Sequence, residues 1–327
     1  MYVSVIVPTR NHCESLRNTI VSLQQLNFPN DRYEIIVIDN NSTDDTRRVV
    51  EEGKQQGKKE IIYCKELRVG LHYARHAGAQ IAKGDILVYT DDDVICDPDW
   101  LTELTRPYAD LKVGCVGGKI LPRFETKDPA WAKYPHFLFV LSILDRGSEI
   151  AKVKDAQIYG CNYSVRKTVL YDAGGFHPDS TPPSLMRYLG DGEVGLTNKA
   201  IERDHDVVYT PLAVVTHVIP QERVTMGYFK QRAFIQGVCD SYTEIRKNGS
   251  VALTESGLID SVKSSLGHWL AYCIAVATGG LRLARYEAIF YNCYEKGIRY
   301  HKTEVSNDKK LLEYVLQHDY LDMELGQ

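Results

Sequence analysis

The sequence predicts an α/β fold: a mixed, mostly parallel sheet flanked by helices, with a helical C-terminal extension. Short, wholly apolar runs rich in β-branched residues occur at 3–7, 35–38 and 86–89. Helical patterns of about 12 residues separate them, which is typical of βαβ units in a parallel sheet buried on both faces. From Arg223 onward the pattern becomes mainly helical.

Each element follows from a local pattern. Apolar runs predict strands, and apolar residues three or four positions apart predict helices. On this basis strands are expected at 3–7, 35–38, 61–63 and 86–89, and helices at 16–26 and 70–82. Shorter strand runs at 115–116, 207–209 and 214–215 alternate with turns rich in glycine and proline.

Composition excludes several classes of protein. The chain has 327 residues, of which 44% are hydrophobic and 25% charged, so it is neither disordered nor fibrous. Lys and Arg total 39 against 43 Asp and Glu, which gives a net charge of −4. This balance provides no excess positive charge to bind nucleic acid, so we expect no such partner. Eight scattered cysteines without zinc spacing indicate reduced thiols and a cytoplasmic protein.

One apolar stretch, 266–281, bears on membrane contact. It is shorter than the ~20 residues that span a bilayer, and it contains His268 and three glycines. A buried helix is one interpretation. The other is a helix that lies on a membrane surface, because Arg282 and Arg285 follow the apolar residues. In that case the protein is peripheral at the inner face of the membrane, with the contact at 266–285.

Polar clusters end three of the four apolar runs, as PTRN, DNNS and DDD. If the backbone stays extended, Asp91 and Asp93 point to one side with Cα atoms roughly 6.5 Å apart. One carboxylate could then contact a sugar hydroxyl while the other holds Mg²⁺ or Mn²⁺. The alternative is a solvated acidic turn. Asp39 suits a base edge or a ribose hydroxyl, or else belongs to a helix-capping cluster.

Two familiar nucleotide motifs do not occur. No GxGxxG follows the first strand, which disfavours a dinucleotide oxidoreductase, and there is no GxxxxGK[ST] phosphate loop. Instead, the segments VSVIVPTRN, IIVIDNNSTDDT and ARHAGAQIAKGDILVYTDDDV occur in that order. They resemble the nucleotide-sugar half of family 2 glycosyltransferases with the GT-A (Rossmann-like) fold, and the similarity covers roughly residues 1–220.

The resemblance implies an activity. It implies metal-dependent transfer of a sugar, with inversion, from a nucleoside-diphosphate sugar (a UDP-sugar being the commonest case) to an acceptor hydroxyl in polysaccharide or glycoconjugate synthesis. The cofactor would be Mn²⁺ or Mg²⁺. Whether the acceptor is a glycan, a lipid-linked sugar or a protein is left open, as is a homo-oligomer. Two alternatives remain: a nucleotidyltransferase acting on sugar phosphates, and a non-catalytic nucleotide-sugar-binding protein.

The resemblance also assigns regions and residues. Residues 1–222 would be the GT-A domain, with 1–120 the nucleotide-sugar half and 121–222 the acceptor and catalytic half, and 223–327 a mainly helical region. Nucleotide-sugar contacts are assigned to Pro8, Thr9, Arg10, Asp39, Arg75, Asp91 and Asp92, and metal ligands to Asp93, Asp91 and His217. Arg75 could equally be an exposed helix arginine, and His217 an ordinary core or surface histidine.

The catalytic base is expected in LGDGEVGL, residues 189–196. This segment resembles the family's acidic motif but departs from the usual Glu-Asp pair. Counting back from the strand at 207–209 puts Glu193 in register with the usual aspartate, while Asp191 is the nearby competitor. Arg223 and Arg232 could approach the diphosphate, or could be solvated helix arginines.

Overall fold

The computed structural model describes residues 1–57, 59–251 and 255–321, and the side chains of 255–276, 278 and 279 lie outside that description. Within the described chain, nine strands form one sheet in the order β3-β2-β1-β4-β8-β6-β9-β5, with β7 paired to β9. The strands are β1 (Val3–Thr9), β2 (Tyr33–Asp39), β3 (Ile61–Lys65), β4 (Ile86–Tyr89), β5 (Val94–Cys96), β6 (Val113–Phe124), β7 (Ala151–Val153), β8 (Tyr163–Arg166) and β9 (Asp206–Ile219).

The sheet is mixed and mostly parallel, as predicted. Strands β1 to β4 pair in parallel, and so do β6 and β9, whereas β8, β5 and β7 run antiparallel to their neighbours. The runs at 207–209 and 214–215, expected as separate strands, are parts of the single long strand β9. Proline at position 211 does not end the strand, because the pairing of β6 with β9 shifts register there.

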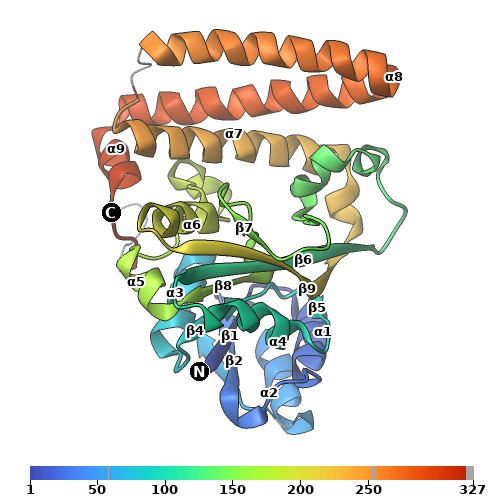
Figure 1. Cartoon of the computed structure of the whole chain (residues 1–327), viewed down its shortest axis with the longest axis vertical. Helices are drawn as coiled ribbons and strands as arrows, with labels where there is room; N and C mark the ends of the chain where they lie inside the picture. Colours follow the sequence, from blue (N-terminus) through green and yellow to red (C-terminus); the bar gives the residue numbers. More distant parts are fainter. Residues whose placement is uncertain (58, 252–254, 322–327) are drawn as a thin grey trace.

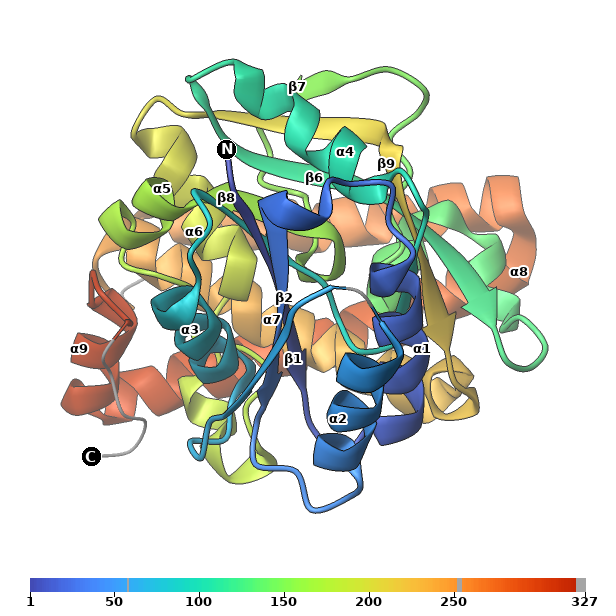
Figure 2. The same ribbon diagram turned by 90° about the horizontal axis from the view of Figure 1, so that it is seen from below.

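Helices cover both faces of the sheet. They are α1 (Cys13–Gln24), α2 (Thr46–Gln56), α3 (Leu71–Ile81), α4 (Trp100–Thr105), α5 (Lys167–Asp172), α6 (Gly192–Glu202), α7 (Met226–Asn248), α8 (Glu255–Asn307) and α9 (Lys309–Leu316). Figure 2 shows α3 on one side of β1 and β2, with α1 and α2 on the other. This sandwich explains why all seven residues of β1 and of β2 are buried.

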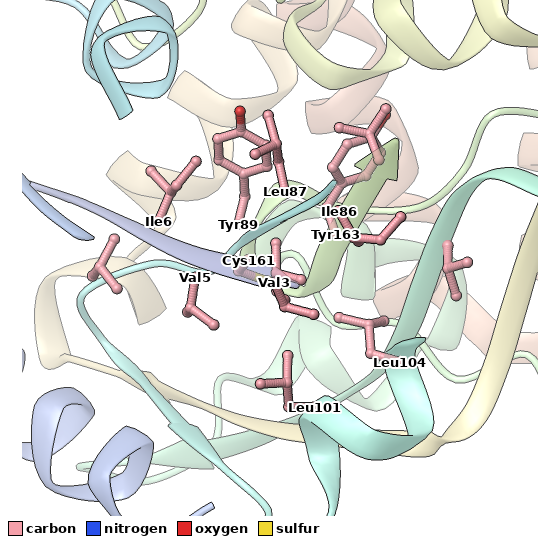
Figure 3. Packing of buried hydrophobic residues seen from close by; sticks show 14 of the residues in the cluster. Val3, Val5, Ile6, Ile86, Leu87, Tyr89, Leu101, Leu104, Cys161 and Tyr163 are labelled. Carbon is pink, nitrogen blue, oxygen red and sulfur yellow. The ribbon is translucent and has the colours of Figure 1, made fainter. Parts of the chain in front are cut away.

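The main core forms where the parallel strands meet their neighbours. Ile6 of β1, Leu87 of β4 and Tyr163 of β8 lie on one face of the sheet, Val5 of β1 points to the opposite face, and all four are fully buried (Figure 3). Each such side chain contributes about 1.5–3 kcal/mol when it leaves water. The rigid sheet that results fixes the positions of the loops that follow its strands.

The C-terminal helices stack beyond the sheet. Helix α7 lies over it, and α8 consists of two arms that fold back on each other at Gly280, whose φ of +70° breaks the helix (Figure 1). Among the described residues, no helix combines the length and the apolar character needed to cross a membrane. Most side chains of the predicted membrane contact, 266–285, lie outside the described part, so that contact remains a prediction.

Candidate functional site

The loops after β1 and β2 meet at one edge of the sheet, because the strands are parallel and Thr9 pairs with Asp39. The backbone N–H of Asn11 donates to Ser42 Oγ (3.0 Å), and the N–H of Thr43 donates to Asn11 Oδ1 (2.8 Å). Asn11 has φ +56°, which asparagine tolerates better than most residues. This edge of the sheet, where hydrogen bonds join the loops after β1 and β2, contains the predicted nucleotide contacts Pro8 and Thr9, both buried, and Arg10, which is exposed.

Asp39 is held rigidly at this edge. Its Oδ1 accepts the N–H of Ser42 at 2.7 Å and its Oδ2 accepts the hydroxyl of Tyr63 at 2.7 Å. Burial and the contact with Asp39 raise the pKa of Tyr63 to about 12, so this hydroxyl remains a donor. Each carboxylate oxygen retains a second acceptor position. The capping interpretation of Asp39 does not hold, because α2 begins at Thr46 with Asp45 at its N-cap. The nucleotide contact assigned to Asp39 remains a prediction.

The aspartate triplet is a turn and not the extended segment assumed from the sequence. Strand β4 ends at Tyr89, and the chain turns at Asp92 and Asp93 before β5 begins. The three side chains consequently have different neighbours. Asp92 Oδ1 lies 3.2 Å from His12 Nδ1, while Asp91 is half-buried and lines a cavity. Burial and the charge of Asp93 raise the pKa of Asp91 to about 6.

Asp93 faces His217 because β5 pairs with β9 directly after the turn. Val94 is in register with His217. His217 Nδ1 donates to the carbonyl of Leu141 (2.9 Å), so Nε2 carries the lone pair, which accepts from Arg223 Nη1 (2.9 Å). The same guanidinium lies 2.9 Å from Asp93 Oδ2.

Asp93 and His217 together offer an oxygen and a nitrogen atom of the kind that binds a divalent cation. Asp93 Oδ1 is buried without a hydrogen-bond partner, and it lies 3.4 Å from the lone-pair nitrogen of His217. Two ligands at right angles around a metal with bonds of about 2.1 Å are roughly 3 Å apart, so the spacing fits. Within the described residues there is no cluster of three His, Cys, Asp or Glu side chains arranged to hold a metal. Asp91, the third predicted ligand, lies towards the cavity.

A large cavity opens beside Asp91, between the sheet and the C-terminal helices. It measures about 1170 Å³, and residues of α6, α7 and α8 contribute to its walls. A smaller hollow of about 520 Å³ lies between α1 and α2, lined by Ile20, Gln24 and Gly53. The smaller hollow contains no carboxylate among its lining residues, whereas Asp91, Glu193 and Asp179 line the larger one. We therefore place the chemistry in the larger cavity.

Arg75 connects the carboxylates of this cavity. The alternative of an exposed helix arginine is wrong, because its side chain is only 3% exposed. Its Nη1 lies 2.7 Å from Asp179 Oδ2 and 3.1 Å from Glu193 Oε2, and its guanidinium stacks over Phe176 at 4.9 Å. A single buried cation thus fixes two acidic side chains from distant segments.

Glu193 receives a further hydrogen bond from the backbone. The N–H of Gly160 donates to Glu193 Oε1 at 2.9 Å. A Cβ at position 160 would lie 2.1 Å from Arg75 Nη2, so only glycine allows the guanidinium and the carboxylate to come this close. Gly192, with φ +52°, turns the chain at the start of α6 and puts Glu193 in its first turn.

Asp179 belongs to the site although the sequence offered no signal for it. It follows the AGGF segment in an irregular loop, with no neighbouring motif. Burial raises its pKa to about 7, the charges of Glu193 and Asp91 add to the rise, and Arg75 opposes it. Its Oδ1 is buried without a hydrogen-bond partner.

Asp191, two residues before Glu193, has different contacts. Its Oδ1 accepts from His177 Nδ1 at 2.5 Å and its Oδ2 accepts the Thr243 hydroxyl at 2.6 Å. Burial lowers the pKa of His177 to about 4, so the histidine is neutral at pH 7 and acts as a donor. Despite burial, these contacts lower the pKa of Asp191. Oδ1 of Asp191 therefore ties the start of α6 to the loop of His177, and Oδ2 ties it to α7.

Comparisons with known proteins identify the family. The family model described as Glycosyl transferase family 2 matches residues 4–171. A glucosyl-dolichyl phosphate glucuronosyltransferase of Haloferax volcanii is 26% identical over 243 residues, covering 72% of this chain and 75% of the relative. Glycosyltransferase AglE of the same organism is 24% identical over 216 residues, covering 66% of either chain.

Solved structures identify the fold. Mannosyltransferase PcManGT from Pyrobaculum calidifontis, solved in complex with GDP-Man and Mn²⁺, matches with a TM-score of 0.56 at 19% identity. The match covers 96% of this chain and 85% of the mannosyltransferase. The curled, mostly parallel sheet with its flanking helices is thus the GT-A fold that the sequence predicted.

Proposed function

Because this chain belongs to glycosyl transferase family 2, we propose that it moves a sugar from a nucleoside-diphosphate sugar to an acceptor hydroxyl with inversion of configuration. The observation that carries the proposal is the position of Asp91. It follows the strand end where parallel sheets bind ligands, and it lines the same cavity as Glu193. A donor sugar could thus bind at one wall of this cavity and an acceptor at another.

The donor would lie along the edge of the sheet where the loops after β1 and β2 meet. Asp39, with its free acceptor positions, suits the base or the ribose, and Pro8, Thr9 and Arg10 would line the nucleoside site. Asp91 and Asp92 would contact the ribose and the sugar. The similarity to relatives leaves both UDP-sugars and GDP-sugars as donors to test.

A divalent cation would be held by Asp93 and His217. The fit rests on the orphaned Asp93 Oδ1 facing the lone pair of His217 Nε2. Bound there, Mn²⁺ or Mg²⁺ would supply positive charge next to the diphosphate. Arg223 Nη1, which now donates to the same Nε2 lone pair, would have to move aside for the cation, and its guanidinium would then serve as a second positive group near the leaving phosphates.

Glu193 would act as the general base. It takes the proton of the acceptor hydroxyl while the acceptor oxygen forms a bond to the anomeric carbon. The bond between that carbon and the diphosphate oxygen breaks, and its electron pair leaves with the nucleoside diphosphate. Arg75 and the N–H of Gly160 hold Glu193 in one orientation. Asp191 is the poorer base, because its side chain is only 5% exposed, against 18% for Glu193, and His177 and Thr243 already contact both its oxygens.

The acceptor belongs to glycoconjugate or polysaccharide synthesis. The name of the Haloferax relative describes transfer onto a sugar carried by a lipid phosphate. An acceptor of that kind would bring this protein to the cytoplasmic face of a membrane, with 266–285 as the proposed contact.

Replacement of Glu193 by Gln tests the proposal. General base catalysis contributes about 10²–10⁴-fold, so Glu193→Gln should lower the hydrolysis or transfer of the preferred nucleotide sugar by that factor. Binding of the nucleoside diphosphate should not change. Glu202→Gln, an exposed site at the end of α6, is the matched control. A Glu193→Gln enzyme with full rate contradicts the role of Glu193, and a product that retains the donor's anomeric configuration contradicts inversion.

A further inference from the structure

Arg232 differs from the other two arginines of the cavity. Arg75 pairs with Asp179 and Glu193, and Arg223 pairs with Asp93. Arg232 also lines the cavity, yet among the described residues no carboxylate pairs with its guanidinium, and its Nε is buried without a hydrogen-bond partner. An unpaired charge in a partly buried site costs free energy unless a ligand compensates it.

The nearby acidic group does not neutralise Arg232. Asp240, two turns further along α7, accepts hydrogen bonds from Gln236 Nε2 (2.8 Å) and from the Tyr294 hydroxyl (2.7 Å). Both oxygens of Asp240 thus accept hydrogen bonds from other groups, and burial raises its pKa. Arg232 therefore faces the cavity without an ion-pair partner among the described residues.

The position of Arg232 along α7 separates it from the donor phosphates. The turn η7 (Gln221–Val224), just before α7, carries Arg223 to Asp93, and Thr243 near the other end of α7 contacts Asp191. Arg232 lies six residues after the start of α7, about 9 Å along the axis. It is thus on the α7 wall between the two ends, across the space that an acceptor would fill.

Part of the wall of the same cavity is apolar and aromatic. Leu138 and Phe139, from the 3-10 helix η4 (Pro135–Leu141), are partly exposed and line the cavity, and so does Phe290 from α8. Phe139 and Phe290 meet edge to face with ring centroids 5.6 Å apart. A single fixed cation beside such a wall matches a ligand that joins an anionic group to an apolar chain.

Resting on the proposed function, we infer that the acceptor is a glycosyl phosphate carried on an apolar chain, and that Arg232 binds its phosphate. The chain would lie over Leu138 and Phe139. The sugar beyond the phosphate would then extend along the cavity, which Glu193 also lines. Arginine suits this task because its planar fork binds phosphate through two parallel hydrogen bonds.

Binding of farnesyl phosphate to the full chain, measured by calorimetry below the critical micelle concentration, tests the inference. Farnesol and inorganic phosphate serve as probes that lack one of the two features. The wild type should bind farnesyl phosphate at least about tenfold more tightly than either. Arg232→Gln should weaken this binding about tenfold or more, and Arg232→Lys should weaken it less. Lys230→Gln, on the exposed face of the same helix, should leave it unchanged.

Donor binding is measured in the same variants, so that failure of the inference differs from failure of the proposed function. Arg232→Gln should bind UDP or GDP with Mn²⁺ as the wild type does. If that variant loses nucleotide binding instead, Arg232 serves the donor and the inference is overturned. Unchanged binding of farnesyl phosphate by Arg232→Gln, or binding of inorganic phosphate as tight as that of farnesyl phosphate, also overturns it. Loss of glycosyl transfer in Glu193→Gln bears on the proposed function alone.

Discussion

At the ends of β2 and β4 the backbone sets the positions of Asp39 and Asp91, whereas Glu193 and Asp179 in the cavity under α7 are held by one arginine from a distant helix. Asp39 and Asp91 follow strands whose register fixes where they lie. Glu193 and Asp179, in contrast, owe their positions to Arg75, which is 118 and 104 residues away in the chain. The donor edge therefore depends on topology, and the acceptor cavity on a few side-chain contacts.

This difference predicts that the cavity is the more fragile region. A substitution at the donor edge removes one ligand contact, but a substitution of the connecting arginine releases two buried charges at once. The following predictions test the comparison, from the largest expected effect to the smallest.

Arg75→Met should have the largest effect on stability. It leaves Asp179 and Glu193 buried without their cation, and breaking a buried ion pair costs about 3–5 kcal/mol. Urea unfolding measures this loss. Arg48→Met is the matched control, because Arg48 forms its ion pairs with Asp45 and Glu52 on the surface, and little change is expected there. Equal loss in the two variants would show that the cavity is not specially dependent on Arg75.

Asp191→Asn should reduce stability more than it reduces catalysis. It weakens charge-assisted hydrogen bonds from His177 and Thr243, each worth about 1.5–3 kcal/mol. The folded variant should retain nucleotide-sugar hydrolysis within about tenfold of wild type, unlike Glu193→Gln. A fall in the rate to the level of Glu193→Gln, without loss of stability, would transfer the role of base to Asp191.

Gly160→Ala should disturb the cavity without touching the donor edge. The added methyl group would lie 2.1 Å from Arg75 Nη2, and overpacking of this kind costs about 1–3 kcal/mol. Hydrolysis of the nucleotide sugar should fall because Glu193 loses its orientation, while nucleotide binding should stay. Gly227→Ala is the control, since its Cβ would have only an ordinary contact at 3.7 Å. Unchanged activity in Gly160→Ala would contradict the importance of this close approach.

The pH dependence of stability should show the raised pKa of Asp179. Its value of about 7 exceeds the ~3.9 of an unfolded chain, so between these values the folded state binds more protons. The contribution of Asp179 to the free energy of unfolding therefore falls as pH rises through this window. Asp179→Asn should flatten that dependence. An unaltered slope would mean that burial and the charges of Glu193 and Asp91, opposed by Arg75 and the backbone of His72, do not raise its pKa.

The meeting of the loops after β1 and β2 could be predicted from the sequence because the signals there are local, while the nucleotide contacts assigned to these loops remain a prediction. Apolar runs mark the strands, and parallel pairing brings the residues after them to one edge, which gave Pro8, Thr9 and Asp39 their places. The same reasoning failed for the shape of the aspartate triplet. Whether it turns depends on the pairing of β5 with β9, more than 100 residues away in the chain.

The acceptor cavity was less predictable because its contacts are long-range. One interpretation of the sequence made Arg75 an exposed helix arginine, because a helical pattern does not show which other segment will cover that face of the helix. Asp179 had no motif around it. Glu193 and Asp191 could be ranked only by counting residues, whereas their opposite surroundings arise from His177, Thr243 and Gly160, each supplied by a different segment.

Calorimetric titration of UDP and GDP, with Mn²⁺ and with a chelator in its place, tests the central claim most directly. We expect the wild type to bind one of the two nucleotides far more tightly with Mn²⁺, and Asp93→Asn and His217→Ala to lose at least about tenfold of that gain. Equal affinity with and without the metal in the wild type, or an undiminished gain in both variants, would contradict a cation held by Asp93 and His217 beside the donor diphosphate.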